Sequence, residues 1–263
     1  MGVLNVTPDS FSDGGRYQDL DAAVSCAARM IAKGADIIDV GGESTRPGAA
    51  EVGITEELQR VVPVITAIRA AYPDVILSVD TSKPEVMSAA VAAGAGLIND
   101  VRALTSTGAL QAAAATQAAV CLMHMQGQPD SMQVAPSYEN VVNEVSGFLT
   151  DRVQTCVAAG IARERILIDP GIGFGKKPEH NLALLAHLPV FSRLKLPLLL
   201  GVSRKSLIGA ILSRPVEHRL SGGVALATAA VLSGARIIRT HDVAETSDAV
   251  RMAQALLQAG YEI

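Results

Sequence analysis

The chain has 263 residues, of which 49% are hydrophobic and 18% are charged, and its 22 Lys and Arg against 26 Asp and Glu give a net charge of −4. The charged fraction is below the roughly 25% of ordinary soluble domains, so most of the chain must be packed and global disorder is excluded. The acidic balance offers no field for a phosphate backbone, so we expect no nucleic-acid partner. No uninterrupted apolar run reaches the ~18 residues of a membrane span, so we expect no membrane insertion.

Three cysteines lie far apart within apolar stretches, at Cys26, Cys121 and Cys156, and none belongs to a CxxC pair. This pattern is typical of reduced residues in a protein core. Met1 leads directly into the first apolar run, without the charged and apolar regions of a secretory signal. We therefore expect a cytoplasmic location.

Short apolar runs alternate along the chain with alanine-rich stretches of helical spacing. The runs predict strands at 2–6, 36–40, 76–80, 97–99, 120–123, 166–169, 198–201 and 236–239. The stretches predict helices at 20–33, 56–71, 84–93, 110–116, 138–159, 179–188, 220–233 and 243–259. Glycine follows several of these stretches where helix ends favour it, and Pro84 stands in a first turn, which accepts proline.

Eight strand-then-helix units average roughly 33 residues each, which favours an α/β fold built as one closed (β/α)8 TIM barrel. Its first strand starts at the chain N-terminus. No linker or break in composition divides the sequence, so we expect a single domain over residues 1–263. An open, doubly wound sheet is the structural alternative.

Reacting groups of such barrels lie at the carboxyl ends of the strands and on the loops that follow them. Polar residues at these places are Asn5, Asp39, Asp80, Asn99, His124, Asp169, Ser203, Lys205, Arg239 and His241. Any one of them could merely cap a helix or form a turn. That explanation is much weaker for the whole ring, which indicates a ligand site.

Two long glycine-rich loops, 7–15 and 41–48, follow the first two strands, and such loops on an active face commonly act as lids. They carry Phe11 and Arg46; ordinary surface loops are the alternative. The segment 169–176 is also rich in glycine but lacks the GxxxxGK[ST] spacing of a nucleotide-binding loop. Arg239 and His241 follow the eighth strand, where this fold commonly binds phosphate.

Two segments, GVLNVTPDSFSDGG at 2–15 and DVGGESTRPG at 39–48, closely resemble the signature segments of the dihydropteroate synthase family. The likeness continues through 78–81, 98–100, 169–176, 203–206 and 239–241. The family is a pterin-binding (β/α)8 barrel of folate biosynthesis. It joins 6-hydroxymethyl-7,8-dihydropterin pyrophosphate to 4-aminobenzoate and releases pyrophosphate. The small-molecule partners that the resemblance implies are these two substrates.

The resemblance also implies residue roles. They are catalysis by Asp80, Lys205 and Asp39; pterin binding by Asp80, Asn99, Asp169 and Lys205; pyrophosphate binding by Thr45, Arg46, Arg239 and His241; aminobenzoate binding by Phe11, Pro47, Phe174 and Ser203, with Lys205; and Mg²⁺ binding by Asn5. A buried carboxylate suits the paired N–H donors of a pterin edge. The aniline nitrogen attacks an already activated carbon, so we expect a dissociative displacement without a covalent enzyme intermediate.

Other functions are compatible with a pterin-binding barrel. A corrinoid-linked methyltetrahydrofolate methyltransferase is the first alternative, but its methyl donor has no pyrophosphate for Arg239 and His241 to hold. A non-catalytic pterin-binding module is the second. Family members are commonly homodimers and usually carry a short segment ahead of the first strand, whose loss we expect to affect stability more than chemistry. We find no insertion near Phe174, so we expect sulfonamides to compete with aminobenzoate.

Overall fold

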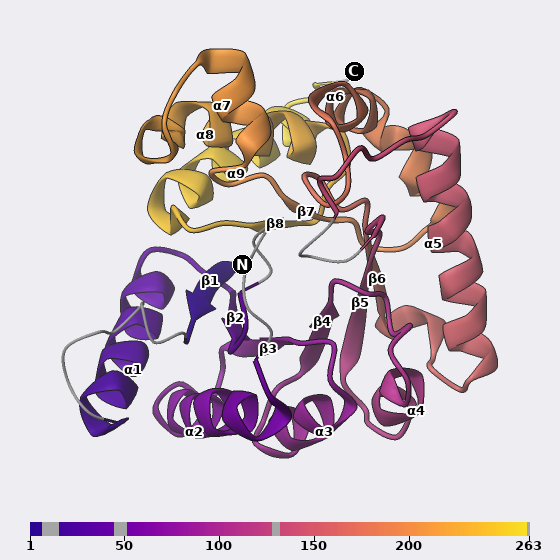
Figure 1. Cartoon of the computed structure of the whole chain (residues 1–263). Coiled ribbons are helices and arrows are strands. Elements are labelled where there is room, and N and C mark those ends of the chain that lie inside the picture. The colour runs from indigo at the N-terminus through magenta and orange to yellow at the C-terminus, as the bar shows by residue number, and fades with distance from the viewer. Residues whose placement is uncertain (7–15, 45–51, 128–131, 262–263) are drawn as a thin grey trace.

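The structure, a computed structural model, describes residues 1–6, 16–44, 52–127 and 132–261. Four predicted site residues, Phe11, Thr45, Arg46 and Pro47, lie outside the described residues. Strands and helices alternate along the chain, and the helices surround the strands (Figure 1).

The strands are β1 (Gly2–Asn5), β2 (Ile37–Gly41), β3 (Ile76–Asp80), β4 (Leu97–Asp100), β5 (Ala119–Met123), β6 (Ile166–Asp169), β7 (Leu199–Gly201) and β8 (Ile237–Arg239). The α-helices are α1 (Arg16–Ala32), α2 (Ile54–Ala71), α3 (Pro84–Ala92), α4 (Ala109–Ala114), α5 (Val141–Ala158), α6 (Pro178–Ala186), α7 (Ser206–Leu212), α8 (Leu220–Leu232) and α9 (Val243–Gln258). Short 3₁₀ helices are η2 (Arg163–Arg165), η3 (Leu188–Leu194) and η4 (Val216–His218).

The strands close into a barrel. Strands β1 to β6 form one parallel sheet in chain order, and β7 pairs with β8. Two backbone bridges join these pieces, Ile168 with Leu198 and Gly2 with Thr240. At the second junction the amide of Val3 donates to the carbonyl of Thr240 at 3.0 Å. The predicted TIM barrel, with its first strand at the N-terminus, is therefore confirmed.

Alternation of side chains along each strand separates two apolar regions. Ile98, Val120 and Ile168 belong to the large core between the strands and the surrounding helices. Their neighbours Cys121 and Leu167 belong to a second, smaller cluster, which lies inside the barrel because successive side chains point to opposite faces. The barrel interior therefore contains apolar side chains of its own, beside buried polar residues such as Ser78 and Asn99.

All eight predicted strands are present in the described part of the chain, but the helices differ from the prediction at three places, of which the first is α1, which begins at Arg16 instead of residue 20. The sequence analysis did not predict α7, which spans only seven residues directly after the Ser203 to Lys205 segment. Helix α5 begins at Val141 instead of residue 138 because the side chain of Asn140 caps it by accepting from the amide of Asn143. Tyr138 instead donates its hydroxyl to the carbonyl of Gly175 at 2.8 Å.

No described helix combines the length and the apolar character that crossing a membrane requires.

Phe191 in η3 is completely buried in the large core. The Phe191→Ala substitution is expected to lower the free energy of unfolding by about 3–5 kcal/mol, because the missing ring leaves a cavity and its apolar contacts are lost. Urea denaturation measures this difference. The matched control is Leu182→Ala, at a side chain that is 45% exposed, which we expect to change stability by less than about 0.5 kcal/mol. Equal losses in the two variants would contradict this placement of the core.

Candidate active site

The strand register aligns predicted site residues in one row across the barrel. Asn5 of β1 pairs with Gly41 of β2, Gly41 pairs with Asp80 of β3, and Asp80 pairs with Asn99 of β4. Paired residues of parallel strands point to the same face. Because Gly41 has no side chain, the row leaves an opening between the Asn5 amide and the Asp80 carboxylate.

A cavity of about 820 Å³ opens above this row. Its volume falls within the range of small-molecule sites. Predicted site residues that line it are Asn5, Asp80, Asn99, Asp169, Phe174, Ser203, Lys205, Arg239 and His241. The structure thus brings together residues that are separated by more than 200 positions in the sequence.

Arg239 connects two carboxylates at the floor of this cavity. Its Nε atom lies 2.6 Å from Oδ2 of Asp39, and its Nη2 atom lies 2.7 Å from Oδ2 of Asp80. The Nδ2 amide of Asn99 also donates to Oδ2 of Asp39, at 3.1 Å. Asp39 is fully buried and does not line the cavity, and its Oδ1 atom has no hydrogen-bond partner among the described residues. Its contacts hold Arg239 in place.

Burial shifts the protonation of two carboxyl groups towards neutral pH. It raises the pKa of Asp80 to about 7, although Arg239 opposes this rise. It raises the pKa of Asp169 to about 6, against the amide of Gly171, which donates to Oδ1 at 2.7 Å, and the charge of Lys205. Burial therefore disfavours the charged form of both groups, and a ligand that donates hydrogen bonds to them would stabilise that form.

Lys205 lies opposite these carboxylates. It is the residue immediately before α7, and its ammonium group stands over the ring of Phe174, 4.1 Å from the centroid. Burial lowers the pKa of Lys205 to about 8, while the charge of Asp169 opposes this shift. A flat ligand between these groups would meet a cation and an aromatic face together.

Buried Lys176 ties down the loop that carries Phe174. Its Nζ atom is 2.9 Å from the carbonyl oxygens of both Gly171 and Phe174, and 2.9 Å from Nδ1 of His124. Gly171 has a φ of +70°, and a Cβ there would lie 1.9 Å from the carbonyl oxygen of His124. Only glycine therefore permits this approach of the two loops. The sequence analysis quoted Lys176 within a motif but gave it no role.

His124, a predicted strand-end candidate, is not among the residues that line the cavity. Burial and the charge of Lys176 lower its pKa to about 3. It therefore stays neutral and supports the loop after β6.

The ends of β7 and β8 meet through Ser203. Its hydroxyl accepts from the amide of His241 at 3.2 Å and donates to Oδ2 of Asp242 at 3.4 Å. Arg204 donates from Nε to the same Asp242 oxygen at 3.1 Å. The side chains of Ser203 and His241 are thereby placed side by side at the edge of the cavity.

The cavity also includes groups that the sequence analysis assigned no role, and these include Glu43, Ser44, Arg204 and Arg219. Arg219 precedes α8, and its Nη1 atom donates to the carbonyl of Arg204 at 3.1 Å. It lies far along the chain from any strand end, so the rule that located the other residues could not find it. Glu43 and Ser44 stand inside a quoted signature segment and could have been found there.

Mg²⁺ was expected at Asn5. Within the described residues there is no group of three or more His, Cys, Asp or Glu side chains able to hold a metal ion. Asn5 nevertheless offers an amide oxygen beside Asp80, and Mg²⁺ usually takes one or two protein oxygens and completes its shell with water and substrate phosphates. The residues present fit an ion that is held largely by a phosphorylated ligand.

Comparisons with known proteins agree on one family. The family model described as pterin binding enzyme matches residues 1–241. The dihydropteroate synthase of Escherichia coli K12 is 56% identical over 98% of this chain and 92% of its own length.

Two solved structures resemble this chain closely, and in each the match covers 94% of the solved chain. The Yersinia pestis dihydropteroate synthase in a sulfonamide drug complex has a TM-score of 0.93 and 53% identity over 98% of this chain. The Xanthomonas albilineans enzyme in complex with 7,8-dihydropteroate has a TM-score of 0.89 and 49% identity over 99% of this chain.

Asp169→Asn is expected to raise the free energy of unfolding at pH 7.5 by up to about 3 kcal/mol, the equivalent of a shift of ~2 pKa units. The pKa of Asp169 in the folded protein, about 6, lies above its ordinary value of 3.8, so its ionisation destabilises the folded protein. This penalty grows as the pH rises from about 4 to about 6 and is then constant. Asparagine keeps an acceptor for the Gly171 amide but does not titrate.

Urea denaturation between pH 4.5 and 7.5 measures the difference between the variant and the original protein. A difference that does not grow with pH in this range would contradict the assignment. Asp151→Asn, at an exposed position of α5, is the matched control and is expected to leave the pH dependence unchanged.

Proposed function

The chain belongs to the pterin-binding enzyme family and, within it, to the dihydropteroate synthases, and from this we infer that it is a transferase of folate biosynthesis. It condenses 6-hydroxymethyl-7,8-dihydropterin pyrophosphate with 4-aminobenzoate and yields 7,8-dihydropteroate and pyrophosphate. The observation that carries this function is the pairing, in one cavity, of buried carboxylates with a group of cations. A pterin needs the carboxylates, and its pyrophosphate needs the cations.

The pterin ring is assigned to Asp169, Asn99 and Asp80, with Lys205 donating to the ring. The 2-amino-pyrimidinone edge presents adjacent N–H donors, which one carboxylate accepts in a plane. Asp169 is buried, and its Oδ1 atom already accepts from the Gly171 amide, which orients the carboxyl group. Since burial disfavours its unpaired charge, pterin donors relieve a cost that the empty site bears.

The pyrophosphate is assigned to Arg239 and His241. Arg239 gives Nε and Nη2 to Asp39 and Asp80, so its remaining nitrogen, Nη1, can donate to a phosphate oxygen. Arg204 and Arg219 line the same cavity and add positive charge as the leaving group gains negative charge. Thr45 and Arg46 complete this set by resemblance to the family, outside the described residues.

The displacement itself needs charge stabilisation and no covalent nucleophile. As the C–O bond to pyrophosphate breaks, positive charge develops on the pterin, and the carboxylate of Asp80, which lines the cavity, offsets it. The aniline nitrogen of aminobenzoate then forms the C–N bond and loses a proton. Asp39 lies beneath the cavity, so we assign it to holding Arg239 rather than to contact with substrate.

Mg²⁺ would be held by Asn5 together with oxygens of the pyrophosphate. When bound, the ion neutralises phosphate charge and favours departure of the leaving group.

The aminobenzoate is assigned to Phe174, Ser203 and Lys205, with Phe11 and Pro47 by resemblance. The ring of Phe174 carries the ammonium of Lys205 on one face, so an aromatic acid at this edge meets both an apolar surface and a cation. A methyltetrahydrofolate methyltransferase is disfavoured, because its substrate has no pyrophosphate for the cations around Arg239.

The remaining parts of the proposal concern organisation. We assign residues 1–263 to one domain, supported by the hydrogen bonds between β1 and the end of β8.

We also propose that the protein forms a homodimer, which light scattering tests. The support is a set of exposed apolar side chains on α7, α8 and α9, which include Ile211, Leu212, Leu220, Met252 and Leu256. A cytoplasmic location, which cell fractionation tests, is consistent with three free cysteines.

The protein incubated with the pterin pyrophosphate, 4-aminobenzoate and Mg²⁺ is expected to release pyrophosphate and form dihydropteroate in equal amounts. Omitting aminobenzoate is expected to stop steady pyrophosphate release, since no acceptor then takes up the pterin to complete the turnover. Chelation of Mg²⁺ with EDTA is expected to stop turnover. A coupled pyrophosphate assay and chromatography measure the two products. Steady release without aminobenzoate, or isolation of a pterin bonded covalently to the protein, would contradict the proposed chemistry.

Sulfonamides are expected to inhibit this turnover in competition with 4-aminobenzoate, raising its KM and leaving kcat unchanged. The 53% identical Yersinia pestis enzyme was solved in a sulfonamide drug complex, which supports this expectation. Phe174→Ala is expected to weaken both aminobenzoate and sulfonamide on the order of tenfold, through the loss of aromatic contact. Initial-rate measurements at varied aminobenzoate test this. Turnover that a large excess of sulfonamide leaves unchanged would contradict the prediction of competitive inhibition.

A further inference from the structure

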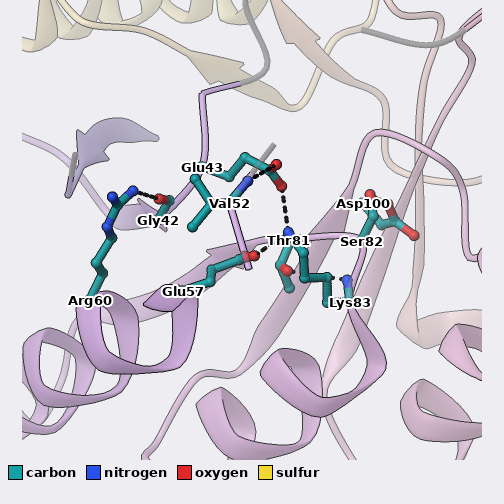
Figure 2. Close-up of polar contacts among 9 residues, drawn as sticks. All are labelled: Gly42, Glu43, Val52, Glu57, Arg60, Thr81, Ser82, Lys83 and Asp100. Atoms are coloured by element: carbon teal, nitrogen blue, oxygen red, sulfur yellow. Dashed lines mark hydrogen bonds and ion pairs between the residues drawn. The ribbon is translucent and has the colours of Figure 1, made fainter. Parts of the chain in front are cut away.

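A lysine outside the residues assigned to substrate joins three segments beside the cavity. Lys83 immediately precedes α3, and its Nζ atom lies 2.6 Å from Oε2 of Glu43 and 2.6 Å from Oε2 of Glu57 (Figure 2). Glu43 follows β2, and Glu57 belongs to the first turn of α2. We call these three residues the Lys83 cluster. Nothing proposed so far requires it.

Lys83 provides the positive charge that stabilises the buried carboxylate of Glu57. Its side chain is completely buried, and its Oε1 atom has no hydrogen-bond partner among the described residues. A buried carboxylate with no cation beside it is strongly destabilising. Burial lowers the pKa of Lys83, but the bonds to Glu43 and Glu57 outweigh burial and raise it above its usual value. The lysine therefore stays charged.

Glu43 performs a different task from Glu57. While its Oε2 atom meets Lys83, its Oε1 atom accepts from the amide of Val52 at 2.9 Å, and Figure 2 shows both contacts. One side chain thus joins the described residues on both sides of positions 45–51. Glu43 and its neighbour Ser44 also line the cavity.

The backbone before Glu43 is held equally closely. Arg60 of α2 donates from Nη1 to the carbonyl of Gly42 at 2.7 Å. A Cβ on Gly42 would lie 2.8 Å from Cγ2 of Val61 and 2.9 Å from Cγ of Glu57, so this backbone packs directly on α2. On the other side, the Lys83 amide donates to Oγ1 of Thr81, next to Asp80.

We propose that Lys83 is a positioning residue for the reaction, which acts through Glu43 to set the backbone at 42–44 and 52 relative to Asp80. Residue 44 immediately precedes Thr45 and Arg46, which the proposed function assigns to pyrophosphate, and the inference rests on that function. Lys83 itself does not line the cavity. Its removal should therefore weaken recognition of the pyrophosphate group and leave recognition of the pterin ring, at Asp169, intact.

Two variants separate positioning from simple neutralisation of Glu57. Glu43→Gln keeps the Lys83–Glu57 pair but replaces one carboxylate oxygen with an NH2 donor, so either the Val52 amide or the Lys83 ammonium meets a donor instead of an acceptor. The double variant Lys83→Met with Glu57→Gln removes the cation together with the buried charge, so no carboxylate is left buried and unpaired, and Glu43 remains. The matched controls are Glu85→Gln, in the exposed first turn of α3, and Lys33→Met at an exposed position.

Both test variants are expected to raise the KM for dihydropterin pyrophosphate on the order of tenfold, with a smaller change in kcat, because displacement of binding groups by a fraction of an ångström weakens alignment. Calorimetry with 6-hydroxymethyl-7,8-dihydropterin, which lacks pyrophosphate, is expected to give a Kd within about twofold of the original protein, since its ring contacts are unaltered. The controls are expected to match the original protein in both measurements.

An unchanged KM in Glu43→Gln would overturn the proposal, because the cluster would then serve only to neutralise Glu57. An equal loss of affinity for the dihydropterin without pyrophosphate would also overturn it, because the effect would then be on the whole site. Should the double variant fail to fold, Glu43→Gln still decides. Failure of the original protein to release pyrophosphate would instead reject the proposed function.

Discussion

The hydrogen bonds that close the barrel between β1 and the end of β8 are the constraint on which the site depends. They join the first strand of the barrel to the end of the last, including Val3 and Thr240. Only because of this closure can Arg239 reach Asp39 and Asp80, from which it is separated by 200 and 159 residues. A parallel barrel sets its strand ends side by side, so one arginine at the eighth strand can bridge the second and third.

Burial inside the barrel explains the electrostatics of the site. The interior contains the apolar side chains of Cys121, Leu167 and Leu199 as well as buried carboxylates. Burial disfavours charge, which is why the pKa values of Asp80 and Asp169 rise. Such a site is less stable when empty than an apolar one would be, and a ligand with N–H donors and a phosphorylated tail supplies the missing partners.

Two lysines, buried Lys176 and partly buried Lys83, support the loops around the site in different ways. Lys176 donates to backbone carbonyls of the loop after β6 and to His124, so it holds the loop by its main chain. Lys83 meets two carboxylates and joins the loop after β2 to α2. Neither lysine lines the cavity, so the loops around it are held by residues outside its wall.

Much of this protein could be read from the sequence. Apolar runs and helical spacing located every strand of the barrel, because hydrophobic periodicity reflects burial directly. The strand-end rule then selected Asp80, Asn99, Asp169 and Arg239, and the signature segments implied what they bind. The seven-residue α7 was missed because so short an element leaves little periodicity, and residue 138 was assigned to α5 because nothing in the spacing revealed that Asn140 caps it.

The tertiary structure alone decided which polar residues share a cavity and which support it. Asp39 and Asp80 look equivalent in the sequence, yet Asp39 lies below the cavity with Arg239 against it, and Asp80 lines it. Arg219 enters the cavity from the start of α8, and Lys83 reaches across to Glu43. The residue pattern within one segment indicates which of its side chains are buried. These roles depend instead on contacts between distant segments, which only the closed barrel brings together.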